Sequence, residues 1–142
     1  MRYAEIELGR TEVLDGRSIT PLPAVHTVPA VGFHLDSGDN SLVFSGDTGC
    51  NDALWQAINR IENLRTVFIE TAFSNRDKRL AELSKHLCPD TLAIELAKLD
   101  RMAEIYVTHL KPGEIELTME EIEAVAGEFR PRMLQNNQVF EF

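Results

Sequence analysis

The feature that most constrains this chain is the run Ser41-Leu-Val-Phe-Ser-Gly-Asp-Thr-Gly49. Three consecutive apolar residues that lead into small polar ones predict a buried strand ending in a tight turn. The turn leaves the carboxylate of Asp47 at the carboxyl end of the strand, where α/β proteins tend to build their sites. An aspartate in this place can be an acid, a metal ligand or a turn former, and its neighbours decide among these roles.

Three of the four histidines, His26, His86 and His109, lie in comparable segments of apolar and small residues. His109 comes directly after a short apolar run that predicts a strand, and no motif surrounds the fourth histidine, His34. Taken one at a time, such histidines are more often core or capping residues than ligands. A functional reading therefore depends on the group as a whole.

In these segments the sequence resembles the metallo-β-lactamase-fold hydrolases. The likeness is closest to their phosphodiesterase branch, which contains class II cyclic-nucleotide phosphodiesterases and tRNA 3′-end-processing endonucleases. A histidine ahead of a Pro-x-x-Gly-aromatic turn matches His26, a Ser-Gly-Asp-Thr strand end matches Asp47, and a Thr-His strand end matches His109. A glutamate in a Glu-Ala-Thr-Phe-like run and a later histidine, both from the endonuclease branch, match Glu70 and His86.

The resemblance implies a site in which two metal ions share ligands. His26 and His109 would each bind one ion and Asp47 would bridge the two; zinc suits such ligands, and manganese is the alternative. His86, oriented by Glu70, would donate a proton to the leaving alkoxide, because the pKa of histidine lies near neutrality. On the residues alone, His86 could equally cap the helix that follows it.

The signature His-x-His-x-Asp-His of that family has no counterpart here. No two histidines are closer than eight positions, and only 25 residues precede His26. The resemblance therefore predicts an α/β (α+β) fold in which residues 1–142 form a single partial domain, the C-terminal half of an αββα metallo-β-lactamase-type sandwich. Because a catalytic zinc usually has at least three protein ligands, we expect the chain alone to bind metal weakly and to be inactive.

Three function classes remain open. The first is the C-terminal portion of a metal-dependent phosphodiesterase-type hydrolase, the second a non-catalytic dimerising or partner-binding relic, and the third a binder of a small molecule or nucleotide. Half a sandwich would leave an apolar sheet face uncovered, and large exposed apolar patches usually mark interfaces. We therefore expect a homo-oligomer or a partner that carries the N-terminal half.

Composition limits these classes further. The 142 residues are 44% hydrophobic, which suffices for one domain with a core. A net charge of −9 without a basic cluster makes nucleic acid an unlikely partner for this chain alone, although a small phosphodiester remains possible. We predict a cytoplasmic protein without membrane contact, since the chain has neither a span-length apolar run nor a signal-peptide pattern. Two cysteines, Cys50 and Cys88, are too few for a disulfide framework, so we expect them reduced.

Strands and helices alternate along the chain. The predicted strands are Glu5–Leu8, Glu12–Leu14, Arg17–Val25, Val31–Leu35, Ser41–Phe44, Thr66–Ile69, Ile105–Val107 and Val139–Phe142. The predicted helices are Asp52–Arg60, Arg76–Leu83, Thr91–Leu99 and Met119–Phe129. The first two strands alternate polar and apolar residues, as the arms of a hairpin would.

Overall fold

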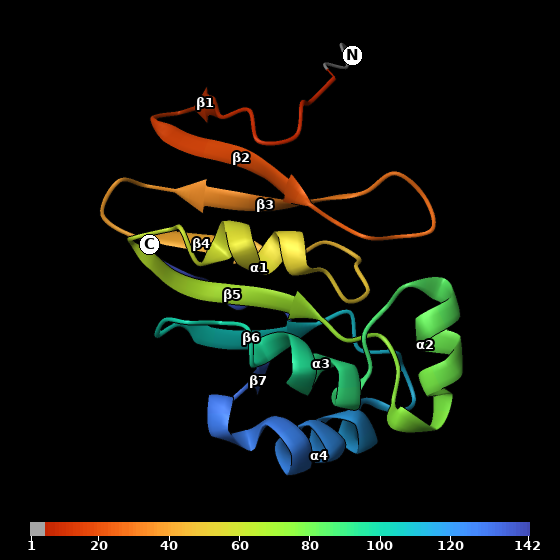
Figure 1. Ribbon diagram of the computed structural model, residues 1–142. Coiled ribbons are helices and arrows are strands. Elements are labelled where there is room, and N and C mark those ends of the chain that lie inside the picture. The colour runs from red at the N-terminus through yellow and green to blue at the C-terminus, as the bar shows by residue number, and fades with distance from the viewer. Residues whose placement is uncertain (1–4) are drawn as a thin grey trace.

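The computed structural model describes residues 5–142, which form one seven-stranded sheet with helices packed against it (Figure 1). The strands lie in the sheet in chain order and are β1 (Glu12–Leu14), β2 (Arg17–Pro23), β3 (Val31–Asp36), β4 (Ser41–Phe44), β5 (Leu64–Glu70), β6 (Glu104–Thr108) and β7 (Arg132–Met133). The helices are α1 (Asp52–Ile58), α2 (Lys78–Ser84), α3 (Pro89–Leu96) and α4 (Ile115–Ala126), with short 3₁₀ helices η1 (Asn75–Asp77) and η2 (Gly127–Phe129). The predicted α/β alternation is confirmed.

Strand direction changes across the sheet. Strands β1 to β4 pair antiparallel, whereas β4 to β7 pair parallel. The parallel strands are joined by crossovers that contain helices, as parallel pairs require. Strands β2, β4, β5 and β6 therefore run in the same direction, and their carboxyl ends meet at one edge of the sheet.

One face of the sheet forms the core. Val43, Val67 and Val107 on adjacent strands are fully buried, and they belong to one cluster with Trp55 of α1 and Leu92 of α3. Alternation along each strand sends every second side chain to the other face. The helices therefore bury only the side chains on the face that carries Val43, Val67 and Val107.

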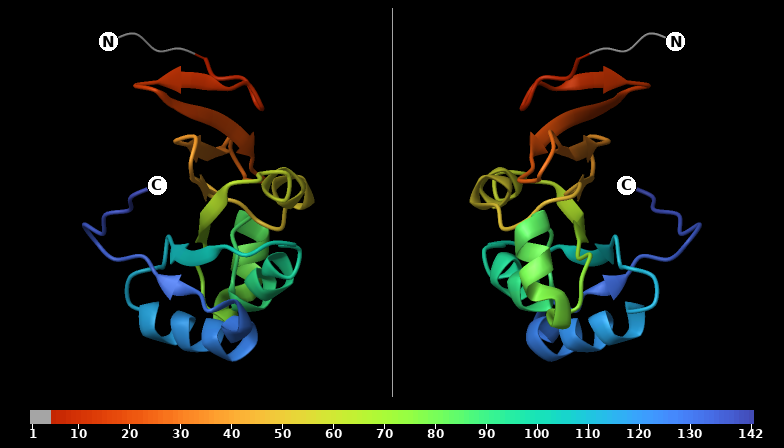
Figure 2. Two further views of the ribbon diagram at one scale, coloured as in Figure 1. Left: turned by 90° about the vertical axis from the view of Figure 1, so that its left-hand side faces the viewer. Right: turned by 90° about the vertical axis from the view of Figure 1, so that its right-hand side faces the viewer.

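The opposite face is covered only in part, and we call its exposed apolar groove the open sheet face. The groove is lined by Ile19, Phe33, Leu35, Leu42, Phe44 and Phe68. The C-terminal segment lies on this side, away from α1 and α3 (Figure 2). Its Phe140 ring lies 4.7 Å from the Phe68 ring and 4.8 Å from the Tyr106 ring. The uncovered apolar face expected of half a sandwich is present.

The predicted N-terminal hairpin is wrong. Glu5–Leu8 is not a strand, and β1 pairs with β2 instead, through a turn at Asp15 and Gly16. Both turn residues have positive φ, 50° and 79°, which is the geometry of a tight two-residue hairpin turn. The Asp-Gly pair was the stronger hairpin signal.

The C-terminal predictions also need correction. Val139–Phe142 forms no strand, because its aromatic side chains pack on the sheet face instead of pairing at an edge. The last strand is β7, which pairs parallel with β6. Helix α4 begins at Ile115 rather than Met119.

Two smaller expectations concern the membrane and the cysteines. Within residues 5–142, no helix is long and apolar enough to cross a membrane. Cys50 is exposed and Cys88 is buried, and both thiols are free.

Candidate active site

The five residues singled out in the sequence lie together at the edge where β2, β4, β5 and β6 end. His26 follows β2, Asp47 follows β4, Glu70 is the last residue of β5, and His109 follows β6. His86 comes from the connection between α2 and α3. Five segments far apart in the sequence thus contribute to one site.

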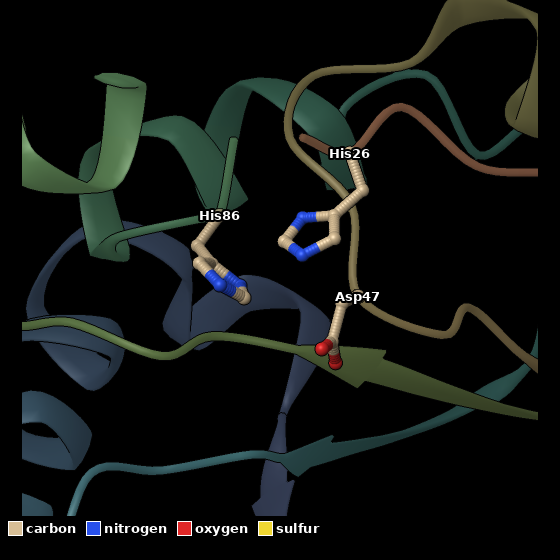
Figure 3. A group of neighbouring side chains, drawn as sticks. All are labelled: His26, Asp47 and His86. Atoms are coloured by element: carbon tan, nitrogen blue, oxygen red, sulfur yellow. The ribbon is translucent and has the colours of Figure 1, made fainter. Parts of the chain in front are cut away.

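His26, Asp47 and His86 form a group that could hold a metal ion. One ligand atom from each lies within 4.8 Å of the other two, and all three residues are half-buried. Figure 3 shows the side chains pointing toward a common space. Two imidazoles and a carboxylate are the ligands that zinc prefers. This group contains His86 where the sequence suggested His109.

His109 lies next to this group. Its Nδ1 atom is 3.3 Å from Oδ1 of Asp47, and its ring stacks on His86 with centroids 5.2 Å apart. The backbone of His109 is left-handed, with φ of 64°, a conformation that costs a non-glycine residue about 1 kcal/mol or more. Such strain is common where a side chain must be held at a functional site.

Two glycines allow the turn that carries Asp47. A Cβ on Gly46, whose φ is 63°, would meet the Val31 carbonyl oxygen at 2.5 Å. A Cβ on Gly32 would meet the carbonyl oxygens of Phe44 and Ser45 at 2.7 Å. Only glycine fits this close approach of β3 and the end of β4. The approach fixes where the chain leaves β4, and therefore where Asp47 lies.

Thr48 and Lys85 also shape the site. The Val25 amide donates to the Thr48 hydroxyl at 2.9 Å, which ties the His26 segment to the turn after β4. The Lys85 carbonyl oxygen lies 3.3 Å from Nδ1 of His26 and can fix the orientation of that ring. The role of Thr48 could have been inferred from its place in the Ser-Gly-Asp-Thr run. A backbone carbonyl such as that of Lys85 leaves no signal in the sequence.

Glu70 is enclosed by donors from its own chain. Its carboxylate is buried, and Oε1 lies 2.6 Å from Nδ1 of His86. The same oxygen accepts from the Thr48 amide at 3.0 Å, and Oε2 accepts from the amides of Ala72 at 3.1 Å and Leu87 at 3.3 Å. This contact at Nδ1 orients the His86 ring and leaves Nε2 for the site.

Burial changes the pKa values of this pair. It raises the pKa of Glu70 to about 7, although the amides of Thr48 and Leu87 oppose the change by stabilising the carboxylate. Burial also lowers the pKa of His86, and the nearby His26 lowers it further. The neutral imidazole is the form that binds a metal. The pair can hold one proton and release it close to neutral pH.

Comparisons with known proteins bear on the fold. No family model matches the chain, and no curated protein matches it in sequence. The structure is similar to the metallo-β-lactamase fold protein YhfI from Bacillus subtilis, with a TM-score of 0.76 and 18% identity over 96% of this chain and 54% of that one. It is also similar to unliganded yeast PDE1, with a TM-score of 0.72 and 16% identity over 92% of this chain and 47% of that one. For the short form of human tRNase Z, the TM-score is 0.57 and the identity 15%, over 71% of this chain and 38% of that one.

These similarities agree with the resemblance found in the sequence. The chain spans about half the length of YhfI and of yeast PDE1. A single sheet with helices on one face and an open apolar face on the other is what half of a two-sheet sandwich would present. The described residues therefore adopt about half of the metallo-β-lactamase fold.

Proposed function

We propose that this chain supplies half of the active site of a metal-dependent phosphodiester hydrolase. The observation that carries the proposal is the convergence of His26, Asp47 and His86 to within 4.8 Å, with His109 and Glu70 in contact with them. Imidazoles and a carboxylate in such a cluster suit zinc-type ions, for which manganese is the alternative. His26, Asp47 and His109 are the proposed ligands, and Glu70 and His86 the proposed acid–base pair.

The chemistry divides between the metal and the chain. A bound ion would act as a Lewis acid that stabilises negative charge on a phosphoryl oxygen. Hydrolysis breaks the bond from phosphorus to the leaving oxygen and adds the hydroxyl of water to phosphorus. The leaving oxygen takes the proton held at Nε2 of His86, and the remaining proton of water restores it. Glu70 keeps the ring oriented through Nδ1.

His86 has two possible roles in this site, proton donor or metal ligand. Its place beside His26 and Asp47 suits a ligand, whereas its bond to Glu70 suits either role. Zinc titration separates the two. If His86 is the acid, His86→Ala keeps most of the zinc affinity and Asp47→Ala loses it. Equal losses in the two variants would make His86 a ligand.

We also propose that a second apolar sheet covers the open sheet face and brings the missing ligands. The groove is lined wholly by apolar side chains, and Phe44 is 38% exposed in it. The first matched structures are about twice as long as this chain, which supports a sheet from outside these 142 residues as the occupant. Such a sheet would end at the same edge as the site.

Light scattering and elemental analysis test this arrangement. At roughly 25 cal/mol per Å² of buried apolar area, a patch of a few hundred Å² favours association by several kcal/mol. The purified chain should therefore self-associate at micromolar concentration, and Phe44→Asp should reduce this. After dialysis against zinc it should retain far less than two equivalents. A stable monomer, or two tightly held ions per chain, would contradict the proposal of an open half-site.

A non-catalytic partner-binding module is the second candidate function, and the open sheet face favours it. The two candidates differ in one experiment, the addition of a segment bearing the His-x-His-x-Asp-His motif. Hydrolysis of bis(p-nitrophenyl) phosphate should then appear if the chain is half of an enzyme. Stable complex formation without any hydrolysis would favour the module.

A further inference from the structure

A separate pocket of about 340 Å³ adjoins the proposed site. His86 and His109 form one side of it, and Phe73, Leu110 and Lys111 contribute to the rest. Its volume lies at the lower end of the range for small-molecule pockets. The pocket shares His86 and His109 with the proposed site, and the rest of its lining belongs to neither that site nor the open sheet face.

The walls of this pocket are fixed by contacts within the chain. The Phe73 ring packs edge-on against His86, with centroids 5.7 Å apart. The segment that carries it is anchored on the far side, because the buried Ser74 hydroxyl donates to Glu114 at 2.8 Å. The Lys111 ammonium lies 4.7 Å from the centre of the Phe73 ring, a cation–π contact. An aromatic platform and one positive charge are thus held beside His86.

The position of His86 decides what would enter the pocket. A proton donor must come within hydrogen-bond reach of the oxygen that receives the proton. The group attached to that oxygen is the leaving group, so it would extend into the space next to His86. That space is bounded by the Phe73 ring and the apolar side chain of Leu110, and Lys111 is the lysine that lines it.

We infer that this pocket is the leaving-group subsite of the proposed hydrolase, and that Phe73 and Lys111 select phosphate esters of flat aromatic groups. The inference rests on the proposed function for its orientation. The Phe73 ring lines the pocket and offers an aromatic contact to an aromatic leaving group. Lys111 offers a charge to the phosphate that bears this group. The affinity of small alkyl esters would increase only through the charge of Lys111, because they have no aromatic ring to contact Phe73.

Binding of phenyl phosphate and methyl phosphate to the chain in excess zinc, followed by NMR, tests this inference. Phenyl phosphate should bind about tenfold more tightly, since the ring buries apolar area that the methyl group lacks. The shifts should centre on the ring resonances of His86 and His109. Phe73→Ala should reduce the preference to about twofold or less, with methyl phosphate affinity little changed. Lys111→Met should weaken both ligands by a similar factor.

Controls separate this result from folding effects and from the proposed function. Phe73→Leu keeps the apolar bulk and should show an intermediate preference, so it carries the test if Phe73→Ala does not fold. Phe44→Ala removes an aromatic ring on the open sheet face and should leave the preference intact. Equal affinities in the wild type, or a preference that Phe73→Ala leaves unchanged, would overturn the inference. Zinc titration of the same samples tests the proposed metal site separately. The leaving-group subsite and the proposed function can therefore be rejected independently.

Discussion

Within the candidate site, Glu70 and Asp47 differ in how far the rest of the chain buries them and provides hydrogen-bond partners. Glu70 is 1% exposed, and its two oxygens accept from three backbone amides and contact the His86 ring, all within this chain. The Asp47 side chain is 41% exposed, and its Oδ1 atom lies 3.3 Å from Nδ1 of His109. This chain encloses the proposed acid–base pair of Glu70 and His86, whereas the proposed metal ligand Asp47 is half-exposed.

We infer from this difference that Glu70 stabilises the fold, whereas the proposed role of Asp47 is to bind a ligand. A buried acceptor with several donors cannot be removed without leaving those donors unsatisfied. A half-exposed carboxylate keeps part of its hydration in the folded state, so its loss changes the free energy of unfolding less than the loss of a buried one. The same edge of the sheet should therefore respond to substitution in two distinct ways.

The largest expected effect is on the proposed catalysis, measured after a segment bearing the His-x-His-x-Asp-His motif is added. His86→Ala should slow the reaction by roughly 10²–10⁴-fold, the usual contribution of a general acid. The loss should be smallest for good leaving groups such as nitrophenolate, which need no proton. Steady-state rates for a series of leaving groups measure this. An equal loss for good and poor leaving groups would exclude the proton-donor role.

The next effect concerns stability. Glu70→Ala removes the acceptor for three backbone amides and should lower the free energy of unfolding by about 3 kcal/mol or more. Urea unfolding followed by circular dichroism gives the value. Glu70→Gln keeps one oxygen and should lose less. A loss below about 1 kcal/mol in Glu70→Ala would show that water replaces the carboxylate.

Stability should also depend on pH through the same residue. The pKa of Glu70 is about 7 in the folded chain and 4.5 ordinarily, so between these values the folded state holds a proton that the unfolded state has lost. The free energy of unfolding should therefore fall as pH rises from 4.5 to 7, by at most about 3 kcal/mol from Glu70. The lowered pKa of His86 acts in the opposite sense near and below pH 6.5. Glu70→Gln should remove the falling component, and parallel curves for the two proteins would contradict this assignment.

The smallest expected effect on stability is that of Asp47. Asp47→Ala should change the free energy of unfolding by no more than about 0.5 kcal/mol, because its half-exposed carboxylate still contacts water. The same variant should lose zinc affinity by at least about tenfold. Urea unfolding and a zinc competition titration on one sample compare the two losses. A large loss of stability would place Asp47 with Glu70, and the contrast between the two regions would fail.

Much of the site could be predicted from the sequence because it depends on local patterns. Apolar runs followed by Gly46-Asp47 and by His109 identify strand ends, and parallel strands bring such ends to one edge. The donors to Glu70 could not be predicted, since the amides of Thr48 and Leu87 reach it through tertiary contacts. Whether His86 or His109 lies nearer to His26 depends on loop geometry that no spacing rule describes.

The fold was predictable to a similar extent. The alternation of strands and helices follows from periodicity, as for β4 and α1. The N-terminal pairing was missed because two segments shared the alternating pattern and only the turn at Asp15 and Gly16 decides between them. The composition of the C-terminal segment Val139–Phe142 predicts a strand. It packs through Phe140 because an uncovered apolar face competes with edge pairing.

The central claim is that this chain presents metal ligands at one edge of its sheet. Crystals soaked in zinc, with anomalous scattering measured on both sides of the zinc absorption edge, locate the ion directly. The account predicts a partly occupied zinc peak among His26, Asp47 and the imidazoles of His86 and His109, and its loss in Asp47→Ala. His34→Gln, the variant of the remaining histidine, should keep the peak. A zinc peak only elsewhere, or one that survives in Asp47→Ala, would contradict the account.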